Sequence, residues 1–160
     1  MTPEDWLALD GTLYVDEAGD PWMVFCHEWA QIQDGTVEAM RLTPDLKHAA
    51  GEPVTLFYGS DVPWSKPWAE TNYVVDGSFL YREKGKLMML WSLFSNGGYT
   101  MGVAESATGK VTGPWIQHEK PLCDADGGHS MVFHDLNGKC FYVVHTPNSR
   151  GNERPQVIPF

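Results

Sequence analysis

Hydrophobic and polar positions alternate along the chain in short runs that are separated by turn residues. Three such runs, "TLYVD", "SFLYR" and "SMVFH", each lead through a Gly-containing turn into a more apolar run: "PWMVFCHE", "LMMLWSLF" and "CFYVVHT". Period-two alternation bounded by Gly or Asn turns is typical of β-hairpins. Helical periodicity is weak everywhere, and residues 43–50, its one candidate, are predicted to form a turn. The pattern predicts an all-β protein.

The three hairpins belong to a repeat. A polar residue stands nine positions before each turn glycine: Asp10 before Gly19, Asp76 before Gly85, and His129 before Gly138. Further apolar runs follow the first two hairpins and predict third and fourth strands, whereas only "RPQVIPF" follows the third. Units of about 40–50 residues or a little more, each a small antiparallel sheet, are typical of β-propeller blades. We therefore expect about three four-stranded blades, the last lacking its fourth strand.

The repeat also predicts which residues meet. Leu13, Phe79 and Val132 should lie on innermost strands of three successive sheets. Asp10, Asp76 and His129 open those strands, so we expect them to converge at one end of the propeller axis. The alternative is that Asp10-Gly11 and Asp76-Gly77 are ordinary turn dipeptides, which they resemble in composition. A turn does not require a histidine, so the third copy favours a site.

Composition narrows the class of protein. The 160 residues suit one domain, residues 1–160, and 42 % apolar and 12 % aromatic content argues against disorder. A formal net charge of −10 argues against nucleic acid or an anionic membrane as partner. No apolar run approaches the roughly 20 residues that span a bilayer. No signal-peptide pattern opens the sequence, which predicts a cytoplasmic protein if Met1 is the authentic start. Each cysteine is expected to act as an apolar residue: Cys26, Cys123 and Cys140.

Four segments together resemble glycoside hydrolase family 43: "LDGTLYVDEAGDPWMVFCHEW", "VDGSFLYREKGKLMMLWS", "GVAESATGKVTGPW" and "DADGGHSMVFHDLNGKCFYVVH". The order of the Asp-Gly openings, the Gly-Pro-Trp and the Gly-Gly-His carries the resemblance. It implies a five-bladed β-propeller that hydrolyses arabinan-, xylan- and related plant-type glycosides with inversion at the anomeric carbon. The expected partner is therefore an oligo- or polysaccharide.

The resemblance also implies roles for the three repeat residues. Asp76 matches the general acid, where most relatives have Glu, and Asp10 matches the carboxylate that tunes the pKa of the acid. His129 matches a residue on the axis that in many relatives binds a calcium or sodium ion, directly or through water. The pairing has a chemical reason, because an ionised carboxylate beside an acid raises the pKa of that acid.

The general base is not found at the repeat register. Inversion requires a base about 6.5–9.5 Å from the acid, with a water between them. The other early candidate side chains lie outside the register: Glu4, Asp5, His27, Glu28 and Glu70. We therefore expect the chain to be the C-terminal part of a propeller whose N-terminal blades are missing. Its expected protein partner is a chain that supplies those blades, or a second copy of itself.

Several aromatic and histidine residues are candidates for sugar binding. His27 and Trp29 end the second strand of the first unit, where an imidazole can bind hydroxyls while an indole stacks on a sugar ring. Trp64 lies in a Pro-rich loop, and His145 closes the second strand of the third unit. Packing between blades is the alternative for each. Trp91 and Trp115 fall within strand patterns and are expected in the core.

Three functions are consistent with these features. The first is a glycosidase, or the C-terminal part of one, with Asp76 as acid and Asp10 as its tuner. The second is a non-catalytic carbohydrate-binding or interaction module that has lost the base. The third is a structural propeller repeat without a ligand.

Overall fold

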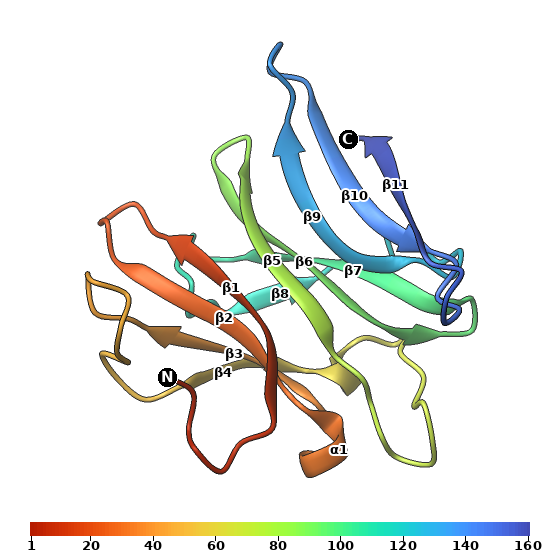
Figure 1. The fold of residues 1–160 in the computed structure, drawn as a ribbon, viewed down its shortest axis with the longest axis horizontal. Helices are drawn as coiled ribbons and strands as arrows, with labels where there is room; N and C mark the ends of the chain where they lie inside the picture. Colours follow the sequence, from red (N-terminus) through yellow and green to blue (C-terminus); the bar gives the residue numbers. More distant parts are fainter.

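The computed structural model describes all 160 residues and contains three antiparallel sheets (Figure 1). The first sheet has the strand order β1 (Ala8–Val15), β2 (Pro21–His27), β3 (Thr36–Arg41) and β4 (Val54–Tyr58). The second has the order β5 (Asp76–Glu83), β6 (Lys86–Ser95), β7 (Gly98–Ser106) and β8 (Trp115–Gln117). The third contains β9 (Gly128–His134), β10 (Cys140–Thr146) and β11 (Arg154–Pro159). The prediction of an all-β protein built from successive antiparallel blades is confirmed. The third blade has three strands and lacks a fourth, as the sequence also predicted.

Helix is confined to two short segments. These are α1 (Trp29–Ile32), which the sequence pattern did not predict, and the 3₁₀ turn η1 (Gly59–Asp61). Residues 43–50 form a turn closed by a bridge between Leu42 and Ala49, as expected. The structure contains no helix of the length and apolarity needed to cross a membrane.

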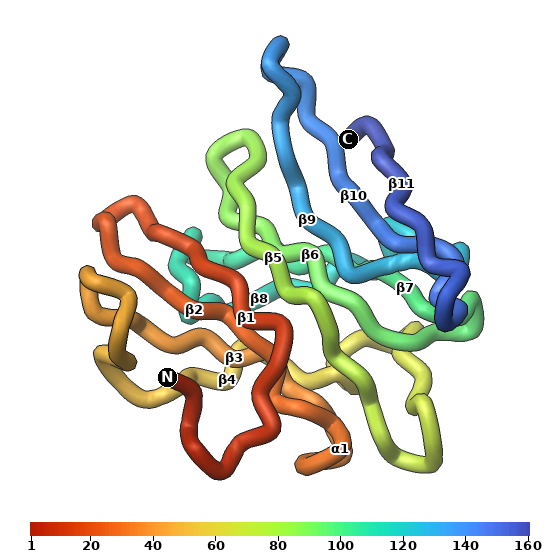
Figure 2. Tube along the Cα trace, in the orientation of Figure 1, coloured from red at the N-terminus to blue at the C-terminus, as the bar shows by residue number.

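The first strand of each sheet lies innermost. Strands β1, β5 and β9 lie side by side and run in the same general direction (Figures 1 and 2). Leu13, Phe79 and Val132 lie on these three strands, in three different sheets, which confirms the architectural prediction. The openings of three successive blades are thereby brought together.

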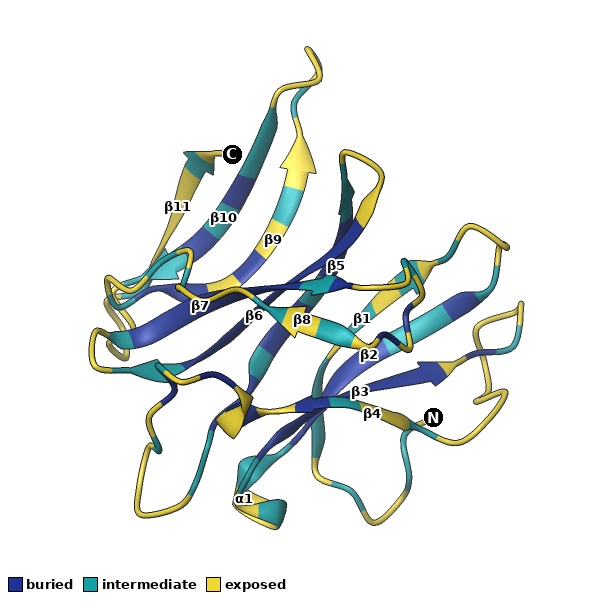
Figure 3. Cartoon of the chain, turned by 180° about the vertical axis from the view of Figure 1, so that it is seen from behind, coloured by how far each residue is buried: buried dark blue, intermediate teal, exposed yellow.

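The core fills the spaces between neighbouring sheets. One cluster, which includes Val24, Phe57 and Trp91, packs the first sheet against the second. Another, which includes Leu90 and Val144, packs the second sheet against the third. Seen from behind, β3, β6 and β7 are largely buried, whereas β11 is largely exposed (Figure 3). Trp91 is fully buried and Trp115 packs against its cluster, so both belong to the core as predicted.

Each innermost strand carries the same β-bulge, in which two residues oppose one on the next strand. Asp10 and Gly11 oppose Phe25, Gly77 and Ser78 oppose Trp91, and His129 and Ser130 oppose Val144. The first residue of each bulge has left-handed backbone geometry, with φ of 57° at Asp10, 57° at Gly77 and 53° at His129. The structural equivalents are therefore Asp10, Gly77 and His129.

Asp76 consequently lies one position before the register of the other two residues, which corrects the sequence alignment. The reason lies in the hairpins: β5 continues one residue further beyond its bulge than β1 and β9 do, while its turn glycine lies two positions nearer to the end of the strand. The β5–β6 turn consists of Lys84 and Gly85, whereas the other two turns span residues 16–20 and 135–139. Alignment on the turn glycines therefore displaces the second unit by one residue.

Candidate functional site

Asp10 connects the three blades at their common end. Its Oδ2 accepts a hydrogen bond of 3.0 Å from the backbone N–H of Gly77, and its Oδ1 lies 3.8 Å from Nε2 of His129. The bulge explains this placement, because the extra residue redirects the side chain at the start of β1. A carboxylate of the first blade is therefore held between the openings of the second and the third.

The glycine after Asp76 makes this close approach possible. A Cβ on Gly77 would lie 2.9 Å from Cα of His129, and the backbone there has the left-handed φ that favours glycine. The Asp-Gly pair is thus not a simple turn dipeptide. Gly77 lets the third blade pack directly on the start of the second.

The carboxyl group of Asp76 is partly buried, and Tyr99 on β7 donates a hydrogen bond of 2.9 Å to its Oδ2. Burial raises the pKa of Asp76 to about 7. The Tyr99 hydrogen bond opposes this rise, while the negative charges of Asp10 and Glu28 add to it. Asp76 is therefore a carboxylic acid that can keep its proton near neutral pH.

Glu28 is a third carboxylate near this pair. It follows β2 directly, and its backbone N–H donates to the carbonyl of Leu7. Its Oε1 is buried without a hydrogen-bond partner. Burial raises the pKa of Glu28, the N–H groups of Ala30 and Trp29 oppose the rise, and the charge of Asp10 adds to it. Sequence analysis did not predict this role for Glu28, because Glu28 does not lie at the position that the repeat marks.

A cleft of about 250 Å³ opens at the junction of the three blades. It is lined by the bulge residues and their neighbours: Asp10, Gly11, Thr12, Gly77, Phe79, His129, Ser130 and Met131. Asp76 does not line this cleft, because its carboxyl group is turned to Tyr99. The Asp10–Gly77 hydrogen bond nevertheless keeps the carboxyl groups of Asp10 and Asp76 within about 10 Å of each other by covalent reach.

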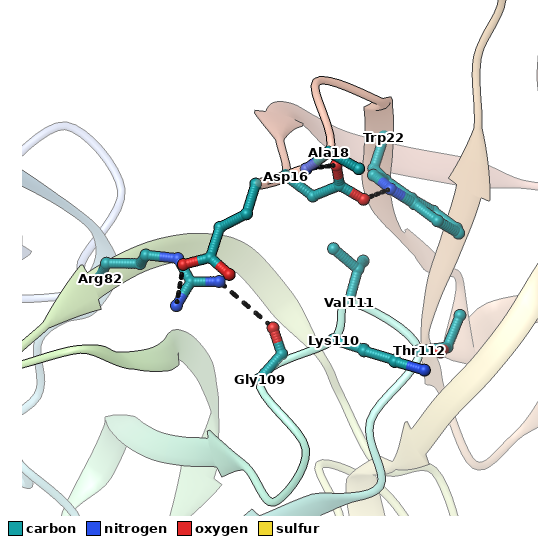
Figure 4. Close-up of a pocket in the computed structure, with 9 residues that line it drawn as sticks. Asp16, Ala18, Trp22, Arg82, Gly109, Lys110, Val111 and Thr112 are labelled. Atoms are coloured by element: carbon teal, nitrogen blue, oxygen red, sulfur yellow. Dashed lines mark hydrogen bonds and ion pairs between the residues drawn. The ribbon is translucent and has the colours of Figure 1, made fainter.

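A second hollow, of about 320 Å³, lies between the β1–β2 turn and the loop after β7 (Figure 4). Three of its four charged side chains, those of Asp16, Glu17 and Arg82, already have partners, and only Lys110 has none. Arg82 lies 3.2 Å from Glu17 and donates to the carbonyl of Gly109, while Asp16 accepts from Nε1 of Trp22 (Figure 4). The Arg82–Glu17 pair joins the first two blades, and most charged groups here are engaged in such structural contacts, so we take the first cleft as the candidate functional site.

The candidate sugar-binding residues occupy different environments. His27 is buried, stacks on Trp6 at 4.0 Å and bonds Gln31, away from the cleft residues. Trp64 packs on Trp91, with ring centroids 6.4 Å apart. None of these contacts reaches the cleft.

The two remaining candidates, Trp29 and His145, also differ. Trp29 is half-buried at the start of α1. His145 lies 6.4 Å from His129 by ring centroids and stacks on Tyr99 at 5.3 Å. Of the four candidates, only His145 is therefore brought to the junction of the blades.

The resemblance also implied a calcium or sodium ion near His129. Calcium takes six to eight oxygen ligands, and the structure forms no group of three or more His, Cys, Asp or Glu side chains suited to a metal ion. Around His129 the residues offer one imidazole and the carboxylate of Asp10. They do not form a protein cage for calcium or sodium, and an ion held mainly through water stays a prediction.

Comparison with known proteins gives a consistent result. The sequence profile of glycosyl hydrolases family 43 matches residues 1–157. A comparison with functionally curated proteins finds no match.

Among solved structures, an endo-arabinase from Bacteroides thetaiotaomicron VPI-5482 is 45 % identical, with a TM-score of 0.95. The match covers 99 % of this chain and 58 % of that one, so the chain spans little more than half of its relative. An alpha-L-arabinofuranosidase from Lactobacillus brevis shares the fold at 20 % identity and a TM-score of 0.77, over 100 % of this chain and 54 % of that one.

Proposed function

Since the chain belongs to glycosyl hydrolases family 43, we propose that it forms the acid-bearing part of an inverting glycosidase that cleaves arabinan- or xylan-type glycosides. The observation that carries the proposal is the state of Asp76, a partly buried acid with a pKa raised to about 7 beside a second carboxylate. Strongly perturbed carboxyl groups of this kind cluster at catalytic sites. Asp76 is the proposed general acid and Asp10 its tuner.

The chemistry follows from these two groups. Asp76 gives its proton to the glycosidic oxygen as the bond from that oxygen to the anomeric carbon breaks, and the bonding electrons stay on the oxygen. Asp10 remains an acceptor for the Gly77 N–H, and its charge favours the protonated form of Asp76. Water attacks the opposite face of the sugar once a base removes its proton.

Arabinan is the first substrate to test. The endo-arabinase named above is 45 % identical over nearly the whole chain, whereas the arabinofuranosidase shares only the fold. Aryl α-L-arabinofuranosides and β-xylosides are the alternatives within the same proposal. His145 is the candidate for contact with the sugar that the structure favours, because it lies beside His129 and Tyr99.

The base is proposed to come from further blades, on the same polypeptide or on another. The endo-arabinase is longer than this chain, which covers 58 % of it. Apolar side chains on the innermost strands are exposed here, among them Leu13 at 54 %, Met131 at 52 % and Phe133 at 38 %. Exposed apolar groups of this kind suit a protein contact, either with those blades or with a second copy of the chain.

A carbohydrate-binding role without catalysis is the second candidate. The observation that favours it is the position of Asp76, which does not line the 250 Å³ cleft. The two functions differ in whether turnover depends on Asp76 once all blades are present.

The test uses the chain together with the purified segment of the Bacteroides thetaiotaomicron endo-arabinase that it does not match. Turnover of linear arabinan and of aryl arabinofuranosides is measured for the unmodified chain, Asp76→Asn and Asp10→Asn. Glu52→Gln serves as a control, because it removes an equal charge at an exposed site outside the cleft.

We expect turnover only in the mixture, with Asp76→Asn reducing it by about 10²–10⁴-fold on substrates with poor leaving groups. Glu52→Gln should have no effect. Saccharide binding without turnover in the assembled mixture would favour the binding role. Turnover that Asp76→Asn leaves unchanged would show that the acid lies elsewhere.

A further inference from the structure

Tyr99 contacts the proposed acid directly from the neighbouring strand. It is 3 % exposed, and its hydroxyl donates to Oδ2 of Asp76 at 2.9 Å. Burial and the charge of Asp76 raise the pKa of the Tyr99 phenol well above its usual range. The hydroxyl therefore keeps its proton at every working pH and remains a donor.

The ring of Tyr99 is fixed on several sides. It stacks on His145, with centroids 5.3 Å apart and an interplanar angle of 16°, and packs against Phe94 at 5.3 Å. Its backbone N–H donates to Asp126 at 3.2 Å. A Cβ on Gly128 would lie 2.7 Å from the ring, so the second glycine of the Gly-Gly-His motif lets β9 approach it. Tyr99 is thus held between the second and third blades.

The hydrogen bond from Tyr99 to Oδ2 of Asp76 determines which carboxyl oxygen carries the proton of the neutral acid. Oδ2 accepts from Tyr99, so the proton of the neutral acid belongs on Oδ1. When that proton leaves, Asp76 becomes a carboxylate and the hydrogen bond from Tyr99 strengthens, because one partner is now charged. An interaction that grows as the proton is transferred stabilises the transition state more than the ground state.

We propose that Tyr99 is a positioning residue that keeps Oδ2 of Asp76 as an acceptor and directs the transferable proton to Oδ1. The inference rests on the proposed role of Asp76 as general acid. Tyr99 does not touch substrate in this account, and it acts only through Asp76.

The test is a titration that does not require turnover. The side-chain carboxyl signals of ¹³C-labelled Asp are followed against pH in the 160-residue chain, and Asp76 is assigned by its loss in Asp76→Asn. Removing a donor to the carboxylate favours the protonated form, so Tyr99→Phe should raise the apparent pKa of Asp76 by about one pH unit or more. Tyr142→Phe is the matched control, because Tyr142 is also buried, at 9 % exposed, but packs on Phe160 and has no contact with Asp76; it should leave the pKa of Asp76 unchanged.

A second measurement covers the case in which Tyr99→Phe fails to fold. Replacing all tyrosines by a fluorotyrosine makes each phenol a stronger donor, and only Tyr99 bonds Asp76. The apparent pKa of Asp76 should then fall. An unchanged or oppositely shifted pKa in these experiments would overturn the role of Tyr99. Loss of that role is distinguishable from failure of the acid assignment, which is judged by the turnover of Asp76→Asn in the assembled mixture.

Discussion

The carboxylate of Asp10 accepts a hydrogen bond of 3.0 Å from the backbone N–H of Gly77, the residue that follows Asp76. This contact joins the first blade to the second at the point where the proposed acid begins its strand. It also fixes a negative charge near that acid. This geometry is the basis for proposing Asp76 as the general acid and Asp10 as the group that raises its pKa.

Asp10→Asn should lower the apparent pKa of Asp76. The substitution removes a negative charge that disfavours ionisation of Asp76, while the amide oxygen can still accept from Gly77. In the assembled enzyme the basic limb of the pH–rate profile should move to lower pH. The carboxyl titration of Asp76 checks this in the chain alone, and a rise in its pKa would contradict the tuning role.

Glu28→Gln should shift the pKa of Asp76 in the same direction. Glu28 adds to the negative charge around Asp76, and its buried Oε1 has no hydrogen-bond partner. Glu52→Gln removes an exposed carboxylate outside the cleft and is the control. If both substitutions shifted the pKa of Asp76 equally, the pKa would respond to net charge alone. That result would contradict a specific effect of Glu28.

Asp76→Asn should stabilise the fold at neutral pH. The pKa of Asp76 is raised from 3.8 to about 7 in the folded chain, so its contribution to stability is fully present below about pH 4 and is lost as pH rises towards 7. That difference corresponds to up to about 4 kcal/mol at pH 7. Urea unfolding at pH 7 and pH 4 measures it, and a variant less stable than the unmodified chain at pH 7 would contradict the shift.

Gly77→Ala should destabilise the chain by more than Gly85→Ala does. Both glycines have left-handed φ, of 57° and 80°, so both substitutions introduce backbone strain of about 1 kcal/mol or more. Only at Gly77 would the new Cβ meet another blade, 2.9 Å from His129, whereas nothing lies within 4 Å at Gly85. Thermal unfolding of both variants separates the backbone strain from the clash between blades. An equal loss of thermal stability in the two variants would argue against close packing at Gly77.

Strand content was predictable because each strand has a local signal. Alternation and turn glycines predicted the hairpins β1–β2, β5–β6 and β9–β10, and the shorter third unit was visible from its one remaining run. The alignment of Asp76 failed by one residue, because glycines mark turns without showing their length. A bulge leaves no comparable signal in a single sequence.

The members of the site were harder to predict. Asp10 and His129 hold equivalent bulge positions, so repetition found them. Tyr99 bonds Asp76 from β7 and Glu28 acts on it through its charge from the end of β2, and neither residue stands at the position that the repeat marks. His27 was expected at the sugar site by its position at a strand end, yet its ring packs on Trp6, since the face to which a strand-end side chain points depends on packing.

The carboxyl titration of Asp76 in the unmodified chain tests the central claim most directly, because it needs neither substrate nor further blades. The account predicts an apparent pKa of about 7, set by burial and by the neighbouring carboxylates against the hydrogen bond from Tyr99. An apparent pKa near the ordinary value of 3.8 would show that Asp76 is ionised at neutral pH and would contradict its assignment as the general acid.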